Sequence, residues 1–264
     1  MGASLNPQVN ADKIANASHF SKERIPTKTF TLTSYTNIRQ RGKPLTIYIE
    51  GDGRAWLSKN RLADDPTPFH PLTLQLASMD PSTNVVYLGR PCQYDGSASQ
   101  KPCDPEYWSN KRFSEEVIAS MNEAVDFLAQ KAGASQIHLV GYSGGAAIAV
   151  LVAARRQDVA SLRTVAGNLD PEAVNRYHGV GPLEGSLDPL MAARIISGIP
   201  QRHFTGSLDE VVPSFAAQNF LKASGSDRCI QITGVSGATH HGVWDKKWRE
   251  LVELPVTCRD NGSL

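Results

Sequence analysis

The segment HLVGYSGGAAIAV, residues 138–150, contains a serine in a setting suited to nucleophilic chemistry. Ser143 stands in the pattern Gly-x-Ser-x-Gly, between an apolar strand-like run and an Ala-rich run of helical character. A sharp turn from strand to helix holds such a serine in a strained conformation with its hydroxyl exposed, and Gly141 and Gly145 would let the two elements approach closely. The pattern alone is common by chance, so the flanking strand and helix are what make it informative.

A serine hydroxyl becomes a nucleophile when a base takes its proton and a carboxylate orients that base. The segment HFTGSLDEVVP places Asp209 just beyond a predicted strand, with Glu210 as the alternative acid. The segment VSGATHHGVW places His240 and His241 in a loop after the last predicted strand. The sequence therefore predicts a group of serine, acid and histidine that follow one another in this order along the chain.

In the order of these three motifs, residues from about 30 to 252 resemble an α/β-hydrolase, of a type exported by bacteria. The resemblance implies an acyl-enzyme mechanism, in which Ser143 attacks a carbonyl, His240 carries the proton and Asp209 orients His240. His240 is preferred over His241 because residues 237–239, Gly-Ala-Thr, match the family's small-residue approach to its histidine.

The function that this resemblance implies is the cleavage of carboxylic esters. A peptidase, a thioesterase or an acyltransferase would use the same triad and stays an alternative. An alternative of another class is a hydrolase fold that binds a partner without catalysing a reaction. None of the three triad residue types is missing from the sequence, which favours the enzyme.

The resemblance also implies where the oxyanion of the reaction is stabilised. In this family the residue after the nucleophile, here Gly144, donates its backbone N–H, and the loop after an earlier strand donates a second. That loop is IYIEGDGRAW, residues 47–56, in which Asp52 is the expected donor and Gly53 the alternative.

This loop departs from the His-Gly-Gly-Gly version of lipases because it contains two acids, Glu50 and Asp52. Carboxylates beside a site that must stabilise negative charge are unfavourable unless they are turned away or neutralised. Arg54 and Arg90 are placed in the sequence to neutralise them, so Arg54→Ala is expected to weaken acylation. The further residues expected to bind substrate or to support the triad are Gly53, Arg54, Tyr142 and His241.

Other residue types that can do chemistry are interpreted as structural. Tyr107 and Trp108 are expected either to line the cleft or to pack beside Cys103. The adjacent histidines lack a carboxylate or thiolate at ligand spacing, and the glycines form no nucleotide-binding loop, so we expect no metal and no cofactor. The remaining histidines are interpreted as ordinary surface residues: His19, His70, His138, His178 and His203.

Strand-like and helix-like segments alternate along the chain. Apolar residues in 113–128 recur at spacings of three and four, which predicts a helix that Gly133 ends, and Trp244 and Trp248 belong to a similar stripe. The alternation predicts an α/β fold with a mainly parallel, doubly wound sheet covered by helices on both faces. The predicted strands are residues 30–38, 44–51, 84–90, 136–142, 161–168, 201–207 and 229–235.

A length of 264 residues suits one large α/β domain. We expect residues 29–264 to form a single hydrolase domain and residues 1–28 to be a loosely ordered arm. Residues 168–200 are expected to supply a short lid. A lid of that length predicts an open cleft, which fits an esterase for modest or polymer-attached acyl groups better than a lipase with a deep tunnel.

The four cysteines have no spacing suited to zinc. Of three pairings, Cys92–Cys103 with Cys229–Cys258 is the most economical, because one bond would staple a surface loop and the other would anchor the tail. Disulfides indicate a periplasmic or secreted protein, and four free thiols in a cytoplasmic protein are the alternative. The N-terminal residues contain no apolar segment, so no signal peptide is recognised in this sequence.

Composition narrows the class of partner. There are 27 Lys and Arg residues against 26 Asp and Glu residues, a formal net charge of +1, so no overall field would attract nucleic acid or an anionic membrane. The most apolar stretch, residues 137–154, is interrupted by His138 and Ser143, which argues against an integral membrane span. The expected partner is a small-molecule or polymer-attached acyl substrate, and the sequence does not indicate an oligomeric state.

Overall fold

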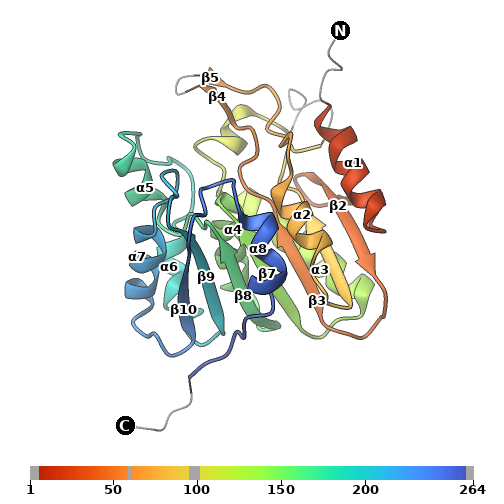
Figure 1. The fold of residues 1–264 in the computed structure, drawn as a ribbon. Coiled ribbons are helices and arrows are strands. Elements are labelled where there is room, and N and C mark those ends of the chain that lie inside the picture. Colours follow the sequence, from red (N-terminus) through yellow and green to blue (C-terminus); the bar gives the residue numbers. More distant parts are fainter. Residues whose placement is uncertain (1–5, 59–60, 95–101, 260–264) are drawn as a thin grey trace.

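A central sheet lies between two layers of helices (Figure 1). The computed structural model describes residues 6–58, 61–94 and 102–259. Over these residues the sheet has eight strands in the order β1-β2-β6-β3-β7-β8-β9-β10. Its strands are β1 (Ser21–Pro26), β2 (Thr31–Ile38), β3 (Leu45–Ile49), β6 (Asn84–Leu88), β7 (Ile137–Tyr142), β8 (Val159–Val165), β9 (Gln201–Gly206) and β10 (Ile230–Val235).

The direction of the strands confirms the predicted mainly parallel sheet. β2 is antiparallel to both of its neighbours, β1 and β6. All other neighbouring pairs, from β6 and β3 to β9 and β10, are parallel. The carboxyl ends of these parallel strands lie at one edge of the sheet, where ligands bind in folds of this kind.

The two helical layers enclose separate cores. Side chains alternate between the faces of a strand, so in β3 Leu45, Ile47 and Ile49 join one apolar cluster while Tyr48 joins the other. One layer contains α3 (Glu115–Ala132), α4 (Gly144–Ala153), α6 (Pro189–Ala193) and α7 (Phe215–Ser224), and α5 (Pro171–Tyr177) contacts α7. The other contains α1 (Pro7–Ala17), α2 (Leu72–Ser78) and α8 (Trp244–Leu251).

Both predicted amphipathic helices are confirmed. α3 buries its apolar stripe, and Gly133 ends it in the left-handed conformation at φ 62°. Trp244 and Trp248 of α8 are fully buried in the core on the opposite face of the sheet. One histidine interpreted as a surface residue, His203, is instead fully buried in β9, where its Nδ1 lies 2.9 Å from Thr164 Oγ1.

The expectation of a loosely ordered N-terminal arm is wrong for residues 7–26, which form α1 and β1. The side chain of Asn6 caps α1 by accepting hydrogen bonds from two backbone N–H groups, and Ala11 and Ala15 are buried. β1 pairs along its length with β2 and buries Ile25. The segment SKERIP was missed because an edge strand exposes most of its side chains to solvent.

Two further short elements lie outside the main sheet. β4 (Trp56–Ser58) and β5 (Arg61–Leu62) pair as an antiparallel hairpin, and η1 (Pro105–Trp108) is a turn of 3-10 helix. Trp108 of η1 is buried in the core and donates from Nε1 to the carbonyl of Ala63. Tyr107 packs edge-on against Phe30 at 4.9 Å between ring centroids. Both aromatic residues therefore have a packing role.

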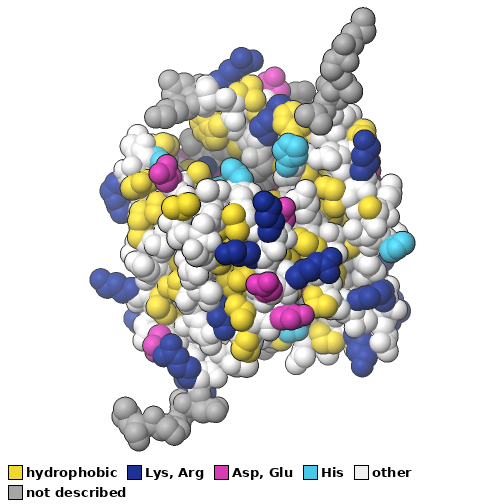
Figure 2. Space-filling view, viewed as in Figure 1, with side chains coloured by type: hydrophobic (Ala, Val, Ile, Leu, Met, Phe, Trp, Pro, Cys, Tyr) yellow, Lys and Arg dark blue, Asp and Glu magenta, His cyan; other side chains and the backbone are white. Residues whose placement is uncertain are grey.

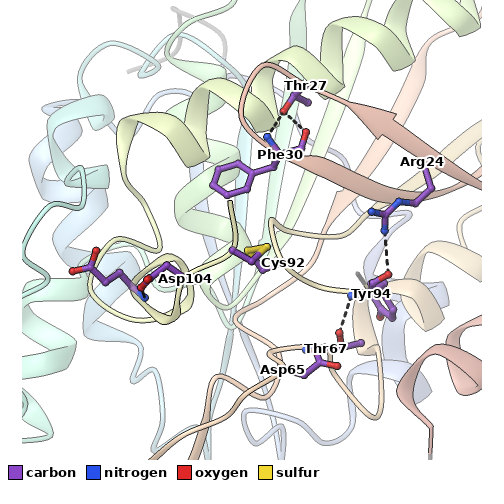
Figure 3. The surroundings of a disulfide bond; sticks show 10 residues. Arg24, Thr27, Phe30, Asp65, Thr67, Cys92, Tyr94 and Asp104 are labelled. Atoms are coloured by element: carbon purple, nitrogen blue, oxygen red, sulfur yellow. Dashed lines mark hydrogen bonds between the residues drawn. A yellow bond between two sulfur atoms is a disulfide. The ribbon is translucent and has the colours of Figure 1, made fainter. Parts of the chain in front are cut away.

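Both predicted disulfides, Cys92–Cys103 and Cys229–Cys258, are present. Figure 3 shows Cys92 beside Phe30, in a turn that also contains Tyr94. The backbone N–H of Tyr94 donates to Thr67 Oγ1 at 2.7 Å, and its carbonyl accepts from Arg24 at 3.1 Å. This turn is thus fixed by covalent and hydrogen bonds to other segments.

The surface carries no large excess of either charge. On the face drawn in Figure 2, basic and acidic side chains are interspersed. None of the helices in the described part of the chain has the length and apolarity needed to cross a membrane.

Candidate active site

Ser143 occupies the turn between β7 and α4. Its backbone has φ 51° and ψ −120°, a conformation that is costly for any residue other than glycine. Two backbone hydrogen bonds of 3.0 Å hold it there, from Ser143 N–H to Val165 and from Asn168 N–H to Ser143. A side chain at Gly145 would overlap the carbonyl oxygens of Ile49 and Glu50. The strained turn expected from the sequence is thus formed, with α4 packed close to β3.

The structure brings the three predicted triad residues together. His240 Nε2 lies 3.0 Å from Ser143 Oγ, and His240 Nδ1 lies 2.9 Å from Asp209 Oδ2. The residues follow β7, β9 and β10, so the shared carboxyl edge of the sheet accounts for their meeting. The arrangement can pass a proton from the hydroxyl to the imidazole and stabilise the resulting cation with the carboxylate.

Asp209 is held by its own turn. Its Oδ1 accepts hydrogen bonds from the backbone N–H groups of Val211 at 2.9 Å and Val212 at 2.8 Å, which leaves Oδ2 for His240. The alternative acid, Glu210, is exposed and makes no contact with the imidazole. The geometry therefore favours Asp209 as the acid.

His241 belongs to a second hydrogen-bonded chain. The hydroxyl of Tyr142 donates to the carbonyl of His240 at 3.1 Å, and it lies 2.7 Å from His241 Nδ1. Because the single phenolic proton is used on the carbonyl, His241 donates from Nδ1 to the phenolic oxygen. Burial, with a smaller contribution from the neighbouring His240, lowers the pKa of His241 and favours this neutral form. His241 thus supports the loop that carries His240.

Two backbone donors are free beside the nucleophile. Among the described residues, the N–H groups of Gly144 and Asp52 make no hydrogen bond. The N–H of Gly51 donates to the carboxylate of Glu50 at 2.9 Å, so Gly51 is not available. Gly53 also has a free N–H and stays the alternative second donor.

The carboxylate of Asp52 is neutralised by two arginines. Arg90, itself buried, forms an ion pair with Oδ1, and Arg112 Nε lies 3.5 Å from Oδ2. Burial alone would raise the pKa of Asp52, but the charges of Arg112 and Arg90 outweigh it and hold this pKa below its ordinary value. The pairing with Arg90 was expected. Arg112 was missed, because no pattern links positions so far apart in sequence.

Glu50 is buried and turned away from the free donors. Its carboxylate accepts from Thr73 Oγ1 at 2.6 Å, from Gly51 N–H at 2.9 Å and from the Tyr87 hydroxyl at 3.0 Å. Burial raises the pKa of Glu50 despite these hydrogen bonds, which moves the carboxyl towards its neutral form. Glu50 therefore destabilises an oxyanion at these donors less than its position in the sequence suggests.

The expectation that Arg54 neutralises these acids is wrong. Its guanidinium carbon lies 4.4 Å from the centroid of the Phe69 ring, in a cation–π contact. The acids are already satisfied, Asp52 by arginines and Glu50 by neutral donors, so neither draws Arg54 towards it.

A cavity of about 620 Å³ opens onto the triad. Its walls come from the loop after β3 and from the segment leading into α2, with the nucleophile turn and the histidine loop at its base. Within the described part of the chain, no residue of the predicted lid at 168–200 lines it. The lining residues that sequence reasoning did not assign to the site include Ala55, Trp56, Pro68, Phe69, His70, Leu72, Gln75 and Val211.

The sheet order, the nucleophile turn and the acid and histidine loops define the α/β-hydrolase fold, which confirms the resemblance at the level of the fold. Solved structures with this fold include an α/β serine hydrolase homologue from Coxiella burnetii, with 18% identity, 89% of this chain and 94% of that chain covered, and a TM-score of 0.57. An esterase from Pyrococcus furiosus has 12% identity, 90% coverage of each chain and a TM-score of 0.60.

A larger protein contains the same fold. The acylaminoacyl peptidase of Pyrococcus horikoshii is 14% identical, with 88% of this chain but 39% of that chain covered and a TM-score of 0.62. No protein-family model and no curated protein matches the sequence. At these identities the likeness establishes the fold alone.

Proposed function

We propose that this chain is a serine hydrolase that cleaves carboxylic esters through an acyl-enzyme. The observation that supports this most directly is the continuous hydrogen-bonded chain from Ser143 Oγ through His240 to Asp209, with contacts of 3.0 and 2.9 Å. These hydrogen-bonded residues lie at a cavity of about 620 Å³, a volume within the range of small-molecule sites.

In the first half of the reaction, Ser143 Oγ bonds to the ester carbonyl carbon while its proton moves to His240 Nε2. The carbonyl oxygen becomes an oxyanion and accepts hydrogen bonds from the backbone N–H groups of Gly144 and Asp52. The carbon–oxygen bond to the alcohol then breaks, and His240 returns its proton to the leaving oxygen. The product alcohol departs and the acyl group stays on Ser143.

In the second half, a water molecule takes the place of the alcohol. His240 accepts a proton from the water, the resulting hydroxide attacks the acyl carbon, and the proton passes to Ser143 Oγ as that bond breaks. Asp209 keeps the imidazole in the tautomer that presents an unprotonated Nε2 to the serine, because Oδ2 accepts a hydrogen bond from Nδ1–H. Both oxygens of Asp209 are hydrogen-bonded, so it keeps this orientation throughout.

The cavity is open to solvent, which favours esters with a modest or polymer-attached acyl group over the long-chain esters that a deep tunnel would hold. Trp56 is 45% exposed and His70 is exposed, and both line the cavity. An acyl group of moderate size, free or attached to a polymer, can therefore reach Ser143 without entering a deep tunnel. The two disulfides support a further proposal, that the protein functions in the periplasm or outside the cell.

Labelling with a fluorophosphonate tests the mechanism. We expect covalent modification of wild-type protein at Ser143, none in Ser143→Ala and much slower modification in His240→Ala. Ser197→Ala, remote from the cavity, is the matched control and should label as wild type does. Labelling that persists in Ser143→Ala, or wild-type protein that does not react, would contradict the proposal. Turnover of p-nitrophenyl esters of several chain lengths, beside peptide and thioester substrates, then tests the substrate class.

A further inference from the structure

Arg54 differs from the other arginines near the cavity. Arg90 and Arg112 contact the carboxylate of Asp52, whereas the Arg54 side chain has no ion pair and no hydrogen bond to any residue of the described chain. Its Nε is buried without an acceptor. Its two terminal nitrogens are not buried in this way, so they are the donors that a ligand in the cavity can reach.

The position of Arg54 is fixed by its surroundings. Its backbone N–H donates to the carbonyl of Pro66 at 2.9 Å, and its guanidinium carbon lies 4.4 Å from the centroid of the Phe69 ring. The carbonyl of Phe69 accepts a hydrogen bond of 2.6 Å from Asn10 in α1, which holds the backbone that carries this ring. A cation–π contact supplies no oxygen acceptor, so the N–H donors of the guanidinium keep their capacity for hydrogen bonds. Arg54 is thus an ordered cation with unused donors.

Arg54 lines the same cavity as Ser143 and His240. The acids that line it are Glu50 and Asp52, and its other titratable groups besides Arg54 are His70, Tyr142, His240 and His241. Glu50 is satisfied by Thr73, Gly51 and Tyr87, and Asp52 by two arginines. Among the residues that the structure describes, no acid is therefore paired with Arg54, although this cation lines the cavity that contains Ser143.

We propose, on the basis of the function proposed above, that Arg54 binds a carboxylate of the substrate. The preferred substrates are then esters that carry a free carboxylate beyond the ester to be cleaved, such as monoesters of dicarboxylic acids. The planar fork of a guanidinium can pair two N–H donors with the two oxygens of one carboxylate. A single cation matches a singly charged anion.

The test compares matched esters. The p-nitrophenyl monoesters of succinic, glutaric and adipic acids are each paired with the neutral ester of the same chain length. The quantity compared is the ratio of kcat/KM for the anionic ester to kcat/KM for its neutral match. In the wild-type protein we expect this ratio to exceed 1 for at least one pair. Arg54→Met should lower that ratio by about 10- to 100-fold, the usual effect of losing a hydrogen-bonded charge pair. Added salt should also lower the ratio in the wild type.

A matched control separates a direct contact from a general effect of charge. Arg61, in β5 of the neighbouring hairpin, is exposed and does not line the cavity. Arg61→Met removes the same charge and should leave the ratio at its wild-type value. An Arg54→Met ratio equal to wild type at every chain length would overturn the inference, and so would an equal fall in Arg61→Met.

Binding to an inactive protein separates this inference from the proposed function. Monomethyl glutarate is titrated into Ser143→Ala and into the same protein with Arg54→Met, and binding is followed by NMR. If no ester is hydrolysed but binding depends on Arg54, the proposed function fails and the carboxylate site stands. If neutral esters are hydrolysed but neither the ratio nor binding depends on Arg54, this inference fails alone. If there is neither hydrolysis nor binding, both fail.

Discussion

The carboxylate of Asp52 lies against the Cα of Gly144, in the space that a side chain at position 144 would need. These two residues also carry the free N–H groups beside Ser143. Arg90 holds the carboxylate in this place and would itself be only 2.9 Å from such a side chain. The spacing of the two donors is therefore set by a contact between the residues that carry them.

Gly144→Ala should accordingly impair turnover. The added methyl group must displace Asp52, which would move the second donor, and losing one such donor reduces kcat by about 100- to 1,000-fold. Steady-state hydrolysis of an activated ester measures the effect. Gly234→Ala in β10, where a methyl group meets nothing within 4 Å, is the control and should keep wild-type kcat. Full activity of Gly144→Ala would contradict this view of the site.

Tyr142→Phe tests the support of the histidine loop. The change removes the hydrogen bonds to the His240 carbonyl and to His241, so the imidazole should spend less time aligned with Ser143. We expect kcat to fall on the order of 10-fold with little change in KM. Tyr48→Phe is the control, because Tyr48 is also buried but bonds to Asp80 and Trp248 away from the triad. It should lower the Tm and leave kcat unchanged, and equal kcat values in the two variants would refute the positioning role.

The two disulfides should have different effects when each is replaced by a pair of serines. Loss of Cys229–Cys258 removes a constraint on the unfolded chain and should cost about 3 to 4 kcal/mol of stability, without a change in kcat/KM. Loss of Cys92–Cys103 should lower both the stability and kcat/KM. The effect on kcat/KM is expected because Cys92 lies two residues from Arg90, which holds Asp52. Chemical denaturation and ester turnover of both variants give the comparison. An equal loss of activity in both would show that Arg90 does not depend on the nearby bond.

The stability of the protein should depend on pH through His203. Burial lowers the pKa of this histidine from 6.5 to about 3. Between these values the unfolded chain binds a proton that the folded protein does not. His203 therefore leaves the free energy of unfolding unchanged above about pH 6.5. As the pH falls from there towards 3, this free energy decreases by up to about 1.4 kcal/mol per pH unit.

His203→Leu should flatten this dependence between pH 6 and 4, as measured by urea unfolding at a series of pH values. Thr164→Val is the matched control, because it removes the same hydrogen bond but keeps the imidazole. Both variants should be less stable at pH 7, and only His203→Leu should have the smaller slope. Equal slopes in wild type and His203→Leu would rule out His203 as the titrating group.

The parts of the site that could be predicted from sequence are those encoded by short local patterns. Ser143 was recognised from the glycines around it, and Asp209 and His240 from loops that follow apolar strands. Because parallel strands share a carboxyl edge, their order along the chain was sufficient to expect that they meet. The same reasoning identified the mainly parallel sheet and the helix that Gly133 ends.

What was missed depends on contacts between segments far apart in sequence, or on weak local signals. Nothing in the sequence links Arg112 to Asp52, or Arg54 to Phe69. The helix α1 has only two buried residues, Ala11 and Ala15, and small side chains give a faint apolar stripe. The hairpin of β4 and β5 is short and largely exposed, so alternation along it does not distinguish strand from loop.

The anchoring of the tail matters for how this protein can be handled. Cys229 directly precedes β10, whereas the loop with His240 follows it, so Cys258 is fastened at the opposite end of that strand from the cavity. At the other end of the chain, Asn10 supports the wall at Phe69. A fusion partner or a solid support attached after residue 259 would therefore leave the cavity entrance unobstructed, whereas one attached ahead of α1 would lie next to the helix that supports one of its walls.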